Sequence, residues 1–168
     1  FYRKLCFAEL GPVLDTLRYI YHETDCWLEV TTLLIPGEND SEAEVAKLAE
    51  WMMIHLGPEV PLHLSAFHPD FKLTHRPHTP ATTLKRARSQ AKLAGLQFVY
   101  TGNIRDSEGG STWCPCCGAQ LIERDWYELG IWHLTEGGAC KTCGYLVPGR
   151  FTDLPGSWGR RRLPLSVK

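Results

Sequence analysis

Residues Trp27 to Ile35 read WLEVTTLLI, a stretch of mostly leucine, isoleucine, valine and threonine that ends at Pro36-Gly37. Its apolar character is nearly continuous, whereas a strand with one face in water would alternate between apolar and polar residues. A short continuous run of this kind, bounded by turn residues, is typical of a buried parallel strand. The sequence therefore predicts a buried β-strand at residues 27–35.

Helices and further strands are predicted on both sides of this strand. The helices show apolar residues at helical spacing, the last two end at glycine, and Ser41 with Glu44 has the pattern of a capping box. Thr79 is predicted to be the N-cap of the last helix, followed by proline in the first turn. The predicted order is a helix from residue 10, the strand 27–35, a helix from residue 42, a strand 61–67, a helix from residue 80 and a strand 96–101.

This alternation predicts an α/β fold with a parallel sheet, because parallel strands need long right-handed crossovers that helices provide. A slice of an α/β barrel is favoured over a doubly wound sheet, although sequence alone separates the two weakly. Three strands are too few to close a barrel. The first residue is Phe1 instead of methionine, so we expect the chain to be a fragment of a longer protein.

The composition excludes several classes of protein. Of the 168 residues, 43% are hydrophobic and 22% are charged, and the formal net charge is −1. Such a balance excludes wholesale disorder and gives no overall attraction to nucleic acid or to an acidic membrane surface. The apolar runs are too short to span a bilayer, and no secretory signal is visible. The paired Cys-x-x-Cys units favour a reducing compartment, so we expect a cytoplasmic protein.

The cysteines predict a metal site. Two Cys-x-x-Cys-Gly units are present, Cys114 to Gly118 and Cys140 to Gly144, and 22 residues separate Cys117 from Cys140. Each tight turn can bring two thiolates to one side, and the glycine after it permits a positive φ. Together Cys114, Cys117, Cys140 and Cys143 can fill a tetrahedral coordination shell, which leaves no open position and indicates a structural site.

Zinc is the first choice for this ion, although iron in a rubredoxin-like site uses the same spacing. The segment between the two units is predicted to form a β-hairpin with an aromatic platform. So small a unit depends on its metal for much of its folding free energy. The three remaining cysteines, Cys6, Cys26 and Cys116, are interpreted as ordinary thiols.

The change in composition near residue 110 predicts the domain boundaries. Residues 1–110 are assigned to the α/β portion, 111–150 to the four-cysteine module and 151–168 to a C-terminal tail. The segment 103–110 is interpreted as a linker. The tail contains Arg160, Arg161 and Arg162, which are expected to be solvated.

Two residues of the α/β portion are candidates for ligand binding. His68 follows the second predicted strand, and Thr31 lies towards the end of the first. In parallel α/β barrels the active site lies at the carboxyl ends of the strands, which is where His68 is expected. His63, inside the second strand, is interpreted as a buried and hydrogen-bonded core residue.

Several motifs together resemble one family of enzymes. The motifs are WLEVTTLLIPGEND at 27–40, LSAFHPDF at 64–71, VYTGNI at 99–104, STWCPCCGAQLIER at 111–124 and CKTCG at 140–144. They resemble the C-terminal half of the radical SAM enzymes of the AmmeMemoRadiSam system, which are similar to the activating enzymes of pyruvate formate-lyase. The resemblance covers essentially the whole chain.

The resemblance implies a partial (β/α) barrel, a [4Fe-4S] cluster and S-adenosylmethionine, which is cleaved reductively to a 5′-deoxyadenosyl radical. His68 matches a histidine beside S-adenosylmethionine, and Thr31 is carried over as a second contact. The Cys-x-x-x-Cys-x-x-Cys triad that binds the cluster is absent from this sequence. We therefore assign no catalytic residue and expect the fragment to be inactive alone.

The same resemblance implies a reductant for the cluster and an unidentified substrate, which could be a protein. A membrane partner is not expected, and nucleic acid is disfavoured. The alternative is a non-enzymatic zinc-ribbon module that uses Trp113, Trp126, Trp132 and the arginine tail to bind protein or nucleic acid.

Overall fold

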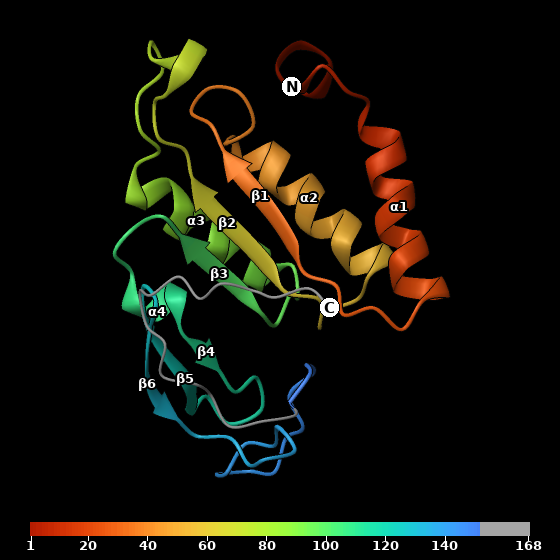
Figure 1. The fold of residues 1–168 in the computed structure, drawn as a ribbon, viewed down its shortest axis with the longest axis vertical. Coiled ribbons are helices and arrows are strands. Elements are labelled where there is room, and N and C mark those ends of the chain that lie inside the picture. Colours follow the sequence, from red (N-terminus) through yellow and green to blue (C-terminus); the bar gives the residue numbers. More distant parts are fainter. Residues whose placement is uncertain (152–168) are drawn as a thin grey trace, which may run out of the picture. The chain divides into compact units, whose positions relative to one another are not determined.

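The chain forms two compact units in a computed structural model (Figure 1), which describes residues 1–151. The first unit is Phe1–Ile104, and the second begins at Arg105. The division falls inside the segment 103–110 that the sequence marks as a linker. The predicted tail and its three arginines lie outside the described residues, apart from Phe151.

The first unit alternates helices and strands in the predicted order. Its elements are a π-helical turn Tyr2–Cys6, α1 Leu10–Glu23, β1 Val30–Leu34, α2 Glu42–His55, β2 Leu62–Ala66, a 3-10 turn Phe71–Leu73, α3 Ala81–Leu93 and β3 Val99–Gly102. The three strands form one parallel sheet in the order β1-β2-β3. The predicted α/β class and parallel sheet are confirmed.

The core of this unit lies between the sheet and the helices α2 and α3, which contact each other (Figure 1). It is built from Leu, Val, Met and Ala side chains of the strands and helices. The principal members are Leu34, Leu62, Leu64 and Val99 of the sheet and Val45, Ala49, Met52, Ala87 and Ala91 of the helices. This burial of apolar surface is what stabilises the unit.

The opposite face of the sheet carries none of this core. In β1, Val30 and Leu34 are buried, while Thr31 and Leu33 are exposed. The sequence predicted a strand buried on both sides, which is wrong for this chain. The reason is tertiary, since among the described residues the helices that contact the sheet pack against its other face.

The starts of the two core helices differ from each other. The Ser41 hydroxyl accepts a hydrogen bond of 3.2 Å from the Glu44 amide, as the capping-box pattern predicts. At α3 the N-cap is Pro80, and the prediction that Thr79 caps this helix is wrong. The buried Thr79 hydroxyl instead donates to the Leu34 carbonyl and accepts from the Phe67 amide. It joins the ends of two strands.

The second unit is an antiparallel sheet followed by loops. Its elements are α4 Ser107–Gly110, β4 Thr112–Trp113, β5 Gln120–Asp125 and β6 Glu128–Trp132, with sheet order β4-β5-β6. Up to residue 151, its buried apolar side chains, apart from two cysteines, are Leu121, Ile122, Leu134 and Val147. This is a much smaller apolar core than that of the first unit.

The aromatic residues of the β5–β6 hairpin do not form the predicted platform. Trp126 and Tyr127 lie at its tip and are 48% and 67% exposed. In β6 the apolar residues Leu129 and Ile131 are exposed as well. The hairpin was predicted correctly, but the aromatic side chains at its tip are exposed, and Trp132 of β6 is half-buried.

Candidate metal centre

The two cysteine loops of the second unit have the same backbone geometry. In the first loop the Gly118 amide donates to the Cys114 carbonyl at 2.9 Å, and the Cys114 amide donates to Ala119 at 2.8 Å. In the second loop the equivalent bonds join Gly144 to Cys140, at 2.9 Å, and Cys140 to Tyr145, at 2.8 Å.

Both loops turn through a glycine in the left-handed region, as the Cys-x-x-Cys-Gly pattern predicts. Gly118 has φ 74° and Gly144 has φ 78°. A side chain would be strained at this φ, and glycine adopts it freely. The turn directs the next backbone amide back towards sulfur, so that Ala119 donates to Cys117 and Tyr145 donates to Cys143.

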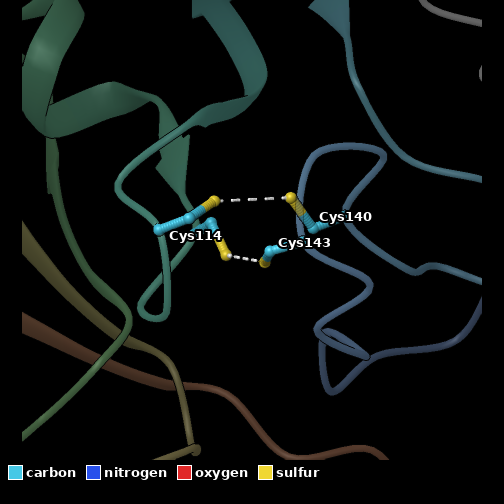
Figure 2. Close-up of side chains that lie close together, drawn as sticks. Cys114, Cys140 and Cys143 are labelled. Carbon is cyan, nitrogen blue, oxygen red and sulfur yellow. Dashed lines mark hydrogen bonds between the residues drawn. The ribbon is translucent and has the colours of Figure 1, made fainter.

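The four sulfur atoms converge on one point. Each lies within 4.8 Å of the other three, and the Sγ–Sγ distances are 3.6 Å for Cys114–Cys143 and 3.7 Å for Cys117–Cys140. Figure 2 shows Cys140 and Cys143 on one loop facing the loop that carries Cys114. A tetrahedron of thiolates about 2.3 Å from one ion has edges of about 3.8 Å. The spacing therefore fits a single metal ion.

Electrostatics make a cation necessary if all four groups are to be thiolates. Desolvation raises the pKa of Cys140, but amide bonds from Cys143 and Thr142 and bonds with neighbouring thiols lower it overall to about 7. An amide bond from Tyr145 acts to lower the pKa of Cys143, yet desolvation and the nearby thiols raise it well above its usual range.

Cys117 behaves like Cys143. An amide bond from Ala119 acts to lower its pKa, but desolvation and the thiols of Cys114 and Cys140 raise it overall. Without a cation, therefore, one thiolate forms easily and repels the formation of others. A divalent ion removes this repulsion and holds all four sulfurs in the charged form.

The loops differ at one position of chemical interest. Cys116 in the first loop is exposed, and its counterpart in the second loop is Thr142, whose hydroxyl lies 2.9 Å from the His133 ring. Cys116 is not a member of the four-sulfur group. Cys6 and Cys26 are exposed thiols of the first unit, as expected.

The two residues predicted to contact S-adenosylmethionine lie in the first unit, at different positions along the strand direction. Thr31 is the second residue of β1, opposite His63 of β2, so the prediction that it lies towards the carboxyl end of the strand is wrong. His68 follows the end of β2, where its exposed ring contacts the Pro69 carbonyl at 2.9 Å and packs edge-on against His78 at 4.3 Å. The structure therefore brings the four cysteines together but does not bring Thr31 and His68 together.

A further group on the open sheet face was missed by the sequence reasoning. His63, interpreted there as buried, is half-exposed and lies 2.6 Å from the Glu29 carboxylate. Its ring stacks on Tyr100 with centroids 5.0 Å apart. The alternation Leu62-His63-Leu64-Ser65 was the available signal, because it marks a strand with one polar face.

Comparison with known proteins identifies a homologue. Protein MJ0808 of Methanocaldococcus jannaschii, described as uncharacterized, is 45% identical over 145 residues, which are 86% of this chain and 43% of that protein. The chain thus spans less than half of its relative's length. No family model matches the chain. No solved structure matches it either.

None of the helices in residues 1–151 is long and apolar enough to cross a bilayer.

Proposed function

We propose that this chain is the C-terminal part of a radical SAM enzyme, and that a structural zinc ion holds its second unit together. The observation that carries the zinc proposal is the convergence of four thiol sulfurs within 4.8 Å. Zinc is preferred because four thiolates in a closed tetrahedron form its usual structural site. Iron accepts the same ligands and is the rival ion.

The small apolar core of the second unit supports a structural role for the ion. Four buried aliphatic side chains stabilise the described part of this unit, so the metal supplies a large share of its folding free energy. With four thiolates bound, no coordination position remains for water or substrate. The ion would therefore hold the loops in place and take no part in a reaction.

The one-sided parallel sheet of the first unit supports the enzyme proposal. Parallel strands are normally covered on both faces, yet here Thr31 and Leu33 are exposed. In a barrel this face lines the interior. The residues that carry the resemblance to radical SAM enzymes, including LSAFHPDF at 64–71, lie on and after these strands.

The free edge of β1 gives a second argument. β1 pairs with β2 on one side only within the described residues, and α1 precedes β1 with Leu17 packed against the core. A helix that leads into a parallel strand is normally the crossover from a neighbouring strand. In the whole protein we expect that neighbour to pair with β1, and MJ0808 has more than half of its length outside the match.

The residues of this chain do not fit the [4Fe-4S] cluster that the proposal implies. Sulfurs 3.6 and 3.7 Å apart are spaced for one ion, and a cluster places several irons and sulfides between its cysteines. The Cys-x-x-x-Cys-x-x-Cys triad is also missing. The cluster therefore belongs to another part of the proposed enzyme. We propose that this enzyme is cytoplasmic, takes electrons from a reductant and acts on an unidentified substrate.

For S-adenosylmethionine the chain offers His68 and Thr31 as proposed contacts. Both side chains are exposed, and His68 lies beyond the carboxyl end of β2. Carboxyl ends of parallel strands are the usual place of ligand sites in α/β folds, which supports His68 alone.

The radical SAM proposal is tested on full-length MJ0808, purified without oxygen and reconstituted with iron and sulfide. We expect each chain to contain about four iron atoms in addition to the zinc ion. After addition of S-adenosylmethionine and dithionite, 5′-deoxyadenosine should form. A protein that has no cluster triad in the sequence outside the match, or that forms no 5′-deoxyadenosine, would overturn the proposal.

One observation favours a second candidate, a zinc-ribbon module that binds another protein. Trp126 and Tyr127 at the hairpin tip are largely exposed, as aromatic contact residues are before a partner binds. The Trp126→Ser/Tyr127→Ser variant separates the two. It should leave 5′-deoxyadenosine formation by the full-length enzyme unchanged and should abolish capture of a partner by the adaptor.

A further inference from the structure

The open face of the parallel sheet presents an ordered row of polar side chains. The strand register places Thr31, His63 and Tyr100 side by side on β1, β2 and β3. The next row on the same face is Leu33, Ser65 and Gly102. Because alternate residues of a strand share a face, these side chains point away from the helical core.

His63 is held on two sides. Its Nε2 lies 2.6 Å from the Glu29 carboxylate, and Tyr100 stacks on its ring with an interplanar angle of 24°. Glu29 in turn accepts a hydrogen bond of 2.8 Å from the Trp27 indole. The side chains of His63 and Glu29 remain 36% and 45% exposed, so this group is both fixed and accessible.

The carboxylate determines what His63 can do. Glu29 accepts a hydrogen bond, so Nε2 carries the proton in the neutral ring and Nδ1 keeps a free lone pair. The rings of His22, His68 and His133 contact carbonyl or hydroxyl oxygens instead.

The neighbouring row leaves room for a ligand. Ser65 and Gly102 are small, and a β-carbon added to Gly102 would come no closer than 3.7 Å to any atom. Asn103 anchors this side by donating hydrogen bonds to the Ser65 hydroxyl, at 2.9 Å, and to the Ala66 carbonyl, at 3.3 Å. Leu33, which is 42% exposed, adds an apolar edge.

We propose that this face binds an uncharged polar small molecule that presents an O–H or N–H group to His63. The ligand donates this hydrogen bond to the lone pair of Nδ1. Glu29 and Tyr100 are positioning residues. The inference deepens the proposed function, because in the barrel this face would line the interior.

The proposal is tested on the 168-residue chain by NMR titration with phenol, which has an O–H donor and an aromatic ring. Toluene has the ring without the donor and is the matched control. Phenol should shift the resonances of Thr31, His63 and Tyr100 saturably, whereas toluene should shift them at least ten-fold less at equal concentration. Equal effects of the two compounds, or shifts that avoid these residues, would overturn the proposal.

Two variants distinguish a ligand site from a structural ion pair. H63F keeps an aromatic ring but removes Nδ1, and it should weaken phenol binding at least ten-fold. Glu29→Gln keeps the hydrogen-bond acceptor but removes the charge, and it should weaken binding several-fold while the amide spectrum stays folded. Unchanged phenol binding in either folded variant would contradict the proposal. These titrations need no cluster, so their failure is separate from that of the radical SAM proposal.

Discussion

The two units of this chain are stabilised by different interactions. The first packs Leu34, Leu62, Leu64 and other apolar side chains between a parallel sheet and helices. The described part of the second has few buried aliphatic side chains and brings four thiols to one point. Burial of apolar surface grows with the size of a unit, so a small unit needs a metal or another cross-link. The comparison predicts that each unit can be unfolded without the other.

The largest effect is expected from the loss of one metal ligand. Cys140→Ser should release the ion and unfold the second unit, because structural zinc contributes about 10–16 kcal/mol to small zinc domains. Hydrogen exchange should show loss of protection over residues 112–147, and metal analysis should show loss of about one zinc per chain. Cys116→Ser is the control, since this exposed thiol is outside the four-sulfur group.

Protection in the first unit decides whether the comparison holds. It should be unchanged in Cys140→Ser, because the core of Phe1–Ile104 contains none of the four ligands. If both units lost protection together, the idea of two independent sources of stability would have to be abandoned.

A smaller effect is expected from a cavity in the first unit. Leu34 is 1% exposed, and Leu34→Ala should cost about 2–5 kcal/mol of unfolding free energy, measured by urea denaturation. Leu33, the next residue on β1, points to the open face and is 42% exposed. Leu33→Ala should cost much less, and the zinc content of both variants should stay that of the parent. Equal costs would mean that another segment covers the open face.

Thr79→Val tests the buried hydroxyl that joins two strand ends. The change removes the partner of the Leu34 carbonyl and of the Phe67 amide, and should cost about 1–3 kcal/mol. Thr82→Val, at an exposed position in the first turn of α3, is the control. If the two variants had the same urea midpoint, the hydroxyl would not stabilise the strand ends.

The smallest effect is expected from the turn glycine of the second cysteine loop. Gly144→Ala meets no neighbouring atom but forces alanine to a φ of 78°, which costs about 1–2 kcal/mol. Zinc affinity, measured by competition with a chromogenic chelator, should fall about ten-fold. Gly137→Ala, which is equally open but has no positive φ, should leave the affinity unchanged.

Local patterns in the sequence were sufficient for much of the fold. The capping box at Ser41, the apolar runs and the glycines at helix ends each act within a few residues, so the order of elements could be predicted. The same holds for the cysteine loops, because the turn that pairs Cys114 with Cys117 is completed within five residues by Gly118. Their convergence with Cys140 and Cys143 was predictable from ligand chemistry.

The residues whose roles were predicted wrongly make contacts between distant parts of the chain. Thr79 looks like a helix cap in sequence, but it bonds to Leu34, which is 45 residues away. His63 looks buried, but its strand has helices on one face only among the described residues, and Glu29 reaches it from 34 residues away. The sequence determined the elements and the four ligands, because both follow from local spacing. Tertiary structure alone decided which sheet face stays open and which side chains meet there, because strand register and helix placement set those contacts.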